Sequence, residues 1–388
     1  MARLFLLFGL LLAWTPLHAE PARLKLAGDA AEQWVPFTLT PGNQIRFHLK
    51  INGRDAVAIL DTGVSVSVVS SSFARSAGMR ISARADADAV GGTVAIGWAS
   101  PRSIHVGALK RTGGRIAVAQ LTAMATGSKA PVDALIGADL LSCCALDIEY
   151  DRHRFRLLPS GTMPFTGASA PLHQVAGSKL YLTRLTLHGQ RIQPVLVDTG
   201  DGGAITISKA AWMRTGMNSK RITTSVSYGL GGPIEMQLTV VPELHVANLT
   251  AKHVELRIEG ADSFSEKTGL AGRIGTAFLQ GYRVLLDPRA GHMVFQPGAL
   301  ADQQPIRSTS GLLVGLDRDR LRVLHVMANS PAAHTGWQDG DTICRVDGQP
   351  VASGDSSDTR WSAGPPGEVV HLGMCDGSRR TLKLADFY

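Results

Sequence analysis

The segment AILDTGVSVSVVS, residues 58–70, returns in altered form as VLVDTGDGGAITIS, residues 195–208. In each copy an apolar run ends in Asp-Thr-Gly and continues into β-branched residues, and an alternating, hairpin-like segment precedes it, at residues 45–57 and 181–194. A carboxylate at the end of an apolar strand is costly unless the protein uses it there. The repeated Asp-Thr-Gly is therefore the feature from which we predict the fold.

The spacing of a second repeated element indicates a duplication. An apolar-apolar-Gly element ends at Gly137, 76 positions after Asp61, and its counterpart ends at Gly275, 77 positions after Asp198. The chain also holds 42 glycines and only 6% aromatic residues, which favours a turn-rich β protein. The sequence predicts one β unit of roughly a hundred residues that is used twice.

A duplicated lobe explains why the sequence contains two such aspartates. Two copies related by a pseudo-twofold axis bring equivalent loops together at that axis, so Asp61 and Asp198 are expected to meet. Two carboxylates in close contact share a proton, because both cannot ionise cheaply. One can then act as general base on a water molecule while the other donates a hydrogen bond to a substrate carbonyl. This predicts peptide hydrolysis without a metal, a cofactor or a covalent intermediate.

The residues that follow each aspartate suit such a site. Gly63 and Gly200 allow the chain to turn sharply and bring backbone N–H groups near the carboxylates. Thr62 and Thr199 carry hydroxyls that can form hydrogen bonds between the two loops. We therefore predict that these four residues support the active-site loops.

Two glycine-rich segments lie about 30 residues after the Asp-Thr-Gly motifs. They read VGGTVAIG at residues 90–97 and YGLGGPIEM at residues 228–236. Either segment can form a mobile hairpin over a cleft. We expect at least one of them to be a flap.

These features resemble the pepsin/retropepsin superfamily of aspartic proteases, specifically bacterial exported members built from two retropepsin-like lobes. The likeness rests on the doubled Asp-Thr-Gly and the doubled apolar-apolar-Gly element. It implies a mostly β, bilobal acid-protease fold of two β-barrel lobes, at residues 40–162 and 170–298. It also implies that Asp61 and Asp198 are the catalytic pair, acting on polypeptide substrates in a monomer.

The chain departs from the pattern of this superfamily at three positions. Val64 and Asp201 follow the two Asp-Thr-Gly motifs where the family usually has Ala, Ser or Thr, and Arg273 replaces an apolar residue. Asp201 places a third carboxylate near the pair, which can raise its pKa values or mark a lobe that has lost catalysis. Two alternatives stay open: a catalytically degenerate peptide-binding adaptor of the cell envelope, and a pair formed between two chains.

The C-terminal part predicts a separate domain. A polar linker at residues 299–309 precedes it, and the segment NSPAAHTGWQDGDTICRVDGQPV, residues 329–351, resembles the PDZ domains of bacterial envelope proteases. The resemblance implies a β-sandwich with short helices at residues 310–388, in which residues 353–364 form one wall of a peptide groove. The alternative is a domain that only stabilises the lobes. The backbone amides that would hold a peptide C-terminus belong to Gly311, Leu312, Leu313, Val314 and Gly315.

The N-terminus reads as an export signal. Residues 1–19 combine Arg3, an apolar run too short to span a bilayer and a plausible cleavage site, and residues 20–39 are an N-terminal extension. An uncleaved anchor stays open, because Leu17 is unusual three residues before the expected cut. The protein is expected to be periplasmic or secreted.

Charge and cysteines limit the other classes of function. The net charge of +7 is scattered along the chain, which indicates a solvated surface and not a nucleic-acid site. The four cysteines and the histidines lack metal-ligand spacing, so no metal site is predicted. Cys344 and Cys375 can pair, whereas the adjacent Cys143 and Cys144 are expected to stay thiols.

Overall fold

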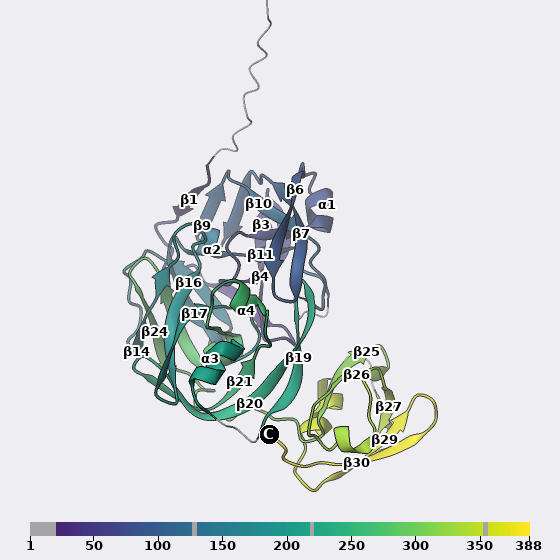
Figure 1. The fold of residues 1–388 in the computed structure, drawn as a ribbon. Helices are drawn as coiled ribbons and strands as arrows, with labels where there is room; N and C mark the ends of the chain where they lie inside the picture. The colour runs from purple at the N-terminus through teal and green to yellow at the C-terminus, as the bar shows by residue number, and fades with distance from the viewer. Residues whose placement is uncertain (1–20, 126–129, 218–220, 352–355) are drawn as a thin grey trace, which may run out of the picture.

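The computed structural model describes residues 21–125, 130–217, 221–351 and 356–388 (Figure 1). The predicted signal peptide at residues 1–19 lies outside the described residues, as does the start of the predicted helical wall, residues 353–355. The described chain is mostly β. Within it, no helix is long and apolar enough to cross a membrane.

The first lobe, residues 21–162, is built around the strand that leads into the first Asp-Thr-Gly. β3 and β4 form the hairpin that the alternation predicts, and β11 lies parallel to β4 on its other side. β2 pairs with β3 and β1 with β9, so the predicted N-terminal extension belongs to the sheet of this lobe. Its elements are β1 (Arg23–Leu26), β2 (Val35–Leu39), β3 (Ile45–Ile51), β4 (Arg54–Leu60), β5 (Val68–Ser70), α1 (Ser71–Ser76), β6 (Ser82–Ala89), β7 (Gly92–Ala99), β8 (Ser103–Val106), β9 (Leu109–Thr112), β10 (Ile116–Ala119), β11 (Ala134–Ile136), α2 (Ala138–Leu141), β12 (Ala145–Glu149), the 3-10 helix η1 (Tyr150–Arg152) and β13 (Arg154–Leu158).

The second lobe, residues 168–298, repeats this plan. β16 and β17 form the hairpin before the second Asp-Thr-Gly, and β22 lies parallel to β17 as β11 does to β4. Its elements are β14 (Ala168–Pro171), β15 (His173–Gln174), β16 (Tyr181–Leu187), β17 (Gln190–Val197), β18 (Ile205–Ile207), α3 (Lys209–Arg214), β19 (Thr223–Gly229), β20 (Gly232–Val246), β21 (Leu249–Ile258), α4 (Phe264–Lys267), β22 (Gly272–Ile274), α5 (Thr276–Leu279), β23 (Tyr282–Asp287) and β24 (His292–Pro297).

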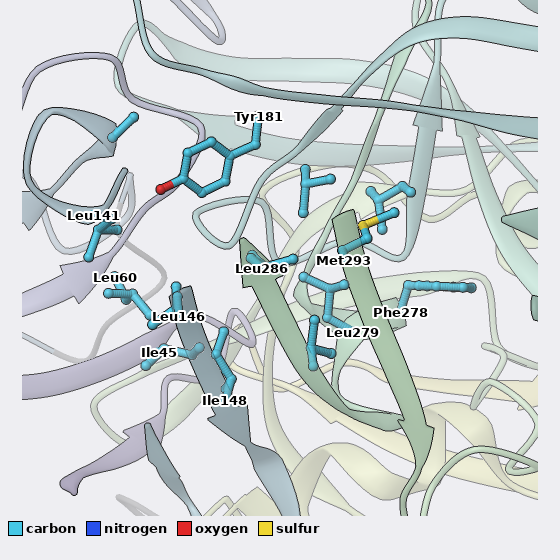
Figure 2. Close-up of a cluster of buried hydrophobic side chains, with 14 of the residues drawn as sticks. Ile45, Leu60, Leu141, Leu146, Ile148, Tyr181, Phe278, Leu279, Leu286 and Met293 are labelled. Carbon is cyan, nitrogen blue, oxygen red and sulfur yellow. The ribbon is translucent and has the colours of Figure 1, made fainter. Parts of the chain in front are cut away.

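A shared sheet and a shared core join the lobes. β12 of the first lobe pairs antiparallel with β23 of the second, which extends one sheet from β2 to β14. Figure 2 shows Leu146 and Ile148 of β12 beside Leu286 of β23 and Met293 of β24, all buried in one apolar cluster. Each such side chain contributes about 1.5–3 kcal/mol on burial. The lobes are therefore fixed to each other near the two Asp-Thr-Gly loops.

The C-terminal domain has its own sheet and its own core. Leu312, Val323, Ile343 and Leu372 come from four different strands and pack with Trp337 in that core. The elements are β25 (Leu312–Asp317), β26 (Arg320–Val326), β27 (Thr342–Val346), β28 (Gln349–Pro350), β29 (Val369–Met374) and β30 (Arg379–Lys383), with the 3-10 helices η2 (Ala333–Thr335) and η3 (Ser356–Ala363).

This domain contacts the second lobe at the base of the hairpin formed by β19 and β20 (Figure 1). The hydroxyl of Thr223 donates to the carbonyl of Ala328 at 2.6 Å, and Thr224 Oγ1 lies 2.7 Å from Nε2 of the buried His325. The C-terminal domain therefore touches a hairpin of the second lobe directly.

The cysteines differ in part from expectation. Cys344 and Cys375 form a disulfide between β27 and the end of β29. Cys143 and Cys144 are also bonded to each other, so the expectation that they stay thiols was wrong. They lie in the turn between α2 and β12, where the backbone bends enough for neighbouring side chains to meet.

Candidate active site

The two Asp-Thr-Gly loops occupy equivalent positions in their lobes. Asp61 directly follows β4 and Asp198 directly follows β17. The backbone N–H of Asp61 donates to the carbonyl of Ile136, and that of Asp198 to the carbonyl of Ile274, both at 2.9 Å. Each aspartate is thus tied to the apolar-apolar-Gly strand of its own lobe.

The threonines connect the loops across the lobe boundary. The Thr62 hydroxyl donates to the carbonyl of Val197 at 2.7 Å and accepts from the Thr199 N–H at 3.1 Å. The Thr199 hydroxyl donates to the carbonyl of Leu60 at 2.7 Å and accepts from the Thr62 N–H at 3.0 Å. All four bonds are buried, so they fix the position of one loop relative to the other.

The glycines bring the carboxylates together. A Cβ on Gly63 would lie 2.3 Å from Cγ of Asp198, and a Cβ on Gly200 would lie 2.4 Å from Cγ of Asp61. Each aspartate therefore occupies the space that a side chain on the opposite loop would need. The N–H of Gly63 donates to Asp61 at 3.0 Å and that of Gly200 to Asp198 at 2.9 Å.

Burial and proximity change how both carboxylates titrate. Burial, and then the charge of Asp198, raises the pKa of Asp61 well above its ordinary value. Burial, and then the charge of Asp201, raises the pKa of Asp198 to about 6, although the Arg273 guanidinium opposes the shift. The pair therefore keeps a proton at a pH where an exposed aspartate has lost it.

A cavity of about 620 Å³ lies over the pair. Its floor includes Asp61 and Asp198, and its lining includes Val90 and Leu230 at the tips of the β6–β7 and β19–β20 hairpins. The tips meet, because the Gly231 N–H donates to the carbonyl of Val90 at 2.9 Å. The structure thus places both predicted flap segments over the cleft.

Two residues that the sequence marked only as departures from the family pattern form an ion pair beside the site. Nε of Arg273 lies 3.1 Å from Oδ2 of Asp201, and Nη1 of Arg273 lies 2.8 Å from the buried Glu259. Burial alone would raise the pKa of Asp201, but Arg273 and then Arg257 hold it below its ordinary value. The sequence could have indicated this ion pair, because an acidic and a basic residue stand in the same lobe at positions where the family pattern has a small and an apolar residue.

The five predicted peptide-binding residues of the C-terminal domain lie at the start of β25. Gly311 has a φ of +79°, and a Cβ there would meet Ser330, so only glycine fits. The N–H groups of Gly311 and Leu312 donate to the hydroxyls of Ser308 and Ser310, both at 3.0 Å. Leu312 is buried, whereas the other three lie half-buried along the strand: Leu313, Val314 and Gly315.

Among the described residues, no group of His, Cys, Asp and Glu side chains is arranged to hold a metal ion.

A comparison with protein families supports the first lobe. Residues 47–143 match the family model described as "gag-polyprotein putative aspartyl protease". The match includes the first Asp-Thr-Gly and the first apolar-apolar-Gly element and covers about a quarter of the chain. No curated protein matches the chain. The first lobe is thus similar to retropepsin-like aspartic proteases, and the second resembles the first through the repeated sequence and geometry described above.

Proposed function

We propose that the protein is an aspartic endopeptidase that hydrolyses peptide bonds with Asp61 and Asp198 sharing one proton. The observation that carries the proposal is the meeting of these carboxylates at the floor of a covered cavity. Its volume lies in the range of sites that enclose a ligand. The similarity of the first lobe to aspartyl proteases supports polypeptide substrates.

The charges around the pair support a division of roles. Each carboxylate accepts the N–H of the glycine two positions on, so these hydrogen bonds do not distinguish the two. The Arg273 guanidinium opposes the rise in the pKa of Asp198 and thereby favours the ionised form of that carboxylate. Asp198 then takes a proton from water as the oxygen attacks the scissile carbonyl carbon. Asp61, protonated, donates a hydrogen bond to the carbonyl oxygen. The tetrahedral intermediate collapses when the leaving nitrogen receives a proton from the pair and the C–N bond breaks.

Cleavage of an unfolded protein substrate from acidic to neutral pH tests this proposal. Asp61→Asn and Asp198→Asn are each expected to abolish cleavage, whereas Asp55→Asn, at an exposed carboxylate paired with Lys50, is expected to retain it. Mixing the two inactive variants tests a pair formed between chains, because only that arrangement restores activity.

The alternative is an adaptor that binds peptides without cutting them. One observation favours it, the charged Asp201 and Arg273 beside the pair, where the family has small or apolar residues. If the protein is an adaptor, the wild type and both aspartate variants bind peptide equally well, and none of the three proteins cleaves it. Cleavage by the wild type alone contradicts the adaptor.

We further propose that residues 310–388 form a PDZ-like domain that binds an extended peptide beside β25. Among the described residues β25 pairs with β26 alone, so its other edge is open for an added strand. The hydroxyls of Ser308 and Ser310 already occupy two amides of the predicted loop, so a peptide carboxylate has to displace them. A peptide with a free C-terminus is expected to bind at least about tenfold more tightly than its amide, as measured by fluorescence anisotropy. Equal binding contradicts the proposal.

Export is a proposal as well, based on the composition of residues 1–19. N-terminal sequencing of protein recovered from the periplasm or the medium tests it. Cleavage after residue 19 is expected, and recovery only from the cytosol contradicts it.

A further inference from the structure

The internal duplication allows the two walls of the cleft to be compared position by position. Ser70 and Ser208 accept the N–H groups that begin α1 and α3, so they are equivalent. Counting back two positions from each makes Val68 equivalent to Thr206. The strand pairs of each lobe extend this alignment to two further pairs. A fourth pair lies three positions after the two aspartates, and its carbonyls accept the N–H groups that begin α2 and α5. The four pairs are Val64 with Asp201, Val68 with Thr206, Ala117 with Arg257, and Leu135 with Arg273.

In the first lobe these positions form an apolar wall. Val68, Ala117 and Leu135 belong to one buried cluster, against which Val64 also packs. Leu230, at the tip of the hairpin from the other lobe, packs against the same cluster. The wall of the first lobe therefore suits an apolar side chain.

In the second lobe the same positions are polar or charged. The Arg273 side chain is 3% exposed, and its charge is balanced inside the wall by ion pairs with Asp201 and Glu259. Asp201 also accepts from the Gly203 N–H at 2.8 Å and from the Thr206 hydroxyl at 3.3 Å. Two ion pairs and these hydrogen bonds hold Arg273 and Asp201 within the wall, so both charges are paired inside the protein.

Arg257 is the most exposed of the charged side chains in this wall. It lines the cleft, its side chain is 22% exposed, and it also borders a second cavity of about 370 Å³. Nη1 donates to the hydroxyl of Ser227 at 3.0 Å, and Nη2 lies 3.3 Å from the carboxylate of Glu255. Its buried Nε–H has no hydrogen-bond partner among the described residues. Glu255 borders the second cavity and not the cleft. On the cleft side Arg257 and Arg273 lie with Asp201, and the other carboxylates of the cleft lining belong to the pair at its floor and to Asp88 of β6.

We propose that the second lobe provides a subsite for an acidic substrate side chain bound by Arg257, while the first lobe binds an apolar side chain. This inference rests on the proposed function and adds the substrate class. A carboxylate gives the buried Nε–H a charge-assisted partner. An apolar side chain would cover Arg257 without pairing it, and a lysine would be repelled by the Arg257 guanidinium. The enzyme thus selects a peptide with an apolar residue and an acidic residue on opposite sides of the cleavage point.

Peptides that differ only in Glu, Gln, Leu or Lys at each position flanking the cleavage point test this subsite. Peptide binding is measured with the Asp61→Asn variant, because this substitution lies in the first lobe and leaves Arg257 and the second lobe unchanged. The value of kcat/KM is measured with the wild-type protein. We expect Glu to exceed Leu by about 10- to 100-fold at one position only. Arg257→Met should remove this preference, and Arg257→Glu should transfer it to Lys. Arg184→Met, at an exposed arginine of β16, is the matched control and should retain it.

The outcomes separate this inference from the proposed function. Cleavage without a preference for Glu, or a preference that survives in Arg257→Met, overturns the acidic subsite and leaves the endopeptidase intact. If wild type cleaves no peptide while the Asp61→Asn variant still binds Glu peptides more tightly, the endopeptidase fails and the subsite stands as a binding site. Equal binding of Glu and Leu peptides overturns the subsite whether or not cleavage occurs.

Discussion

Replacing Asp198 with Asn is expected to stabilise the protein relative to wild type as the pH rises from 4 to 7. Burial and the charge of Asp201 raise the pKa of Asp198 from 3.8 to about 6. Between these values the folded protein holds a proton that the unfolded chain has lost, so the stability of wild type falls with rising pH. Asparagine carries no charge at any of these pH values, so the variant does not lose stability through this group.

The size of the effect follows from the shift in pKa. A pKa of about 6 in the folded protein instead of 3.8 corresponds to about 3 kcal/mol, because a tenfold change in proton affinity is worth about 1.4 kcal/mol. The loss develops from pH 3.8 and is complete above about 6. The charge of Asp198 also raises the pKa of Asp61, so its removal lowers the cost of ionising Asp61 and acts in the same direction.

Urea unfolding at closely spaced pH values measures the effect. The free energy of unfolding of Asp198→Asn minus that of wild type should increase by about 3 kcal/mol between pH 4 and pH 7. Asp55→Asn is the control, since Lys50 lowers the pKa of that exposed carboxylate and its curve should follow wild type above pH 4. Parallel curves for wild type and Asp198→Asn over this range would refute the reasoning.

Three further changes test other parts of the fold. Thr62→Val leaves the buried N–H of Thr199 unpaired and should cost about 2–4 kcal/mol in urea unfolding, whereas Thr62→Ser restores most of it. Replacing Cys344 and Cys375 with serine opens a crosslink between positions 31 apart and should cost about 3–4 kcal/mol, and an unchanged Tm would contradict this. Gly231→Val places a side chain 2.2 Å from the backbone of the other hairpin, so kcat/KM should fall at least about tenfold, and unchanged kinetics would argue against paired flaps.

Local sequence patterns predicted much of the fold. The alternation at residues 45–51 predicts a strand with one buried face, and β3 buries every second residue as expected. The mostly β class was predicted correctly for the same reason. The repeated motif and its spacing predicted that equivalent loops would face each other, because a duplicated unit has a symmetric partner within its own chain.

Contacts between distant strands could not be predicted in this way. The pairing of β12 with β23 joins the lobes, and it is not among the contacts that the repeated sequence predicts. Arg257 lies in β21, where alternating charges resemble an ordinary exposed face. The pairing of β21 with β18 brings Arg257 beside Thr206, and the lining of the cleft then includes the Arg257 side chain.

The two copies differ where an asymmetric substrate would make them differ. Asp, Thr and Gly are identical in both loops, and each of these residues contacts the opposite loop, so a change in either copy disturbs both carboxylates. Each wall position belongs to one lobe and takes no part in the four threonine hydrogen bonds that join the loops. In a symmetric dimer an arginine at the position of Arg257 would appear on both walls, and no apolar wall would remain. A single duplicated chain can change Ala117 and Arg257 independently. The polar wall is therefore compatible with an intact catalytic pair, and the charge at Arg257 need not indicate a lobe that has lost its function.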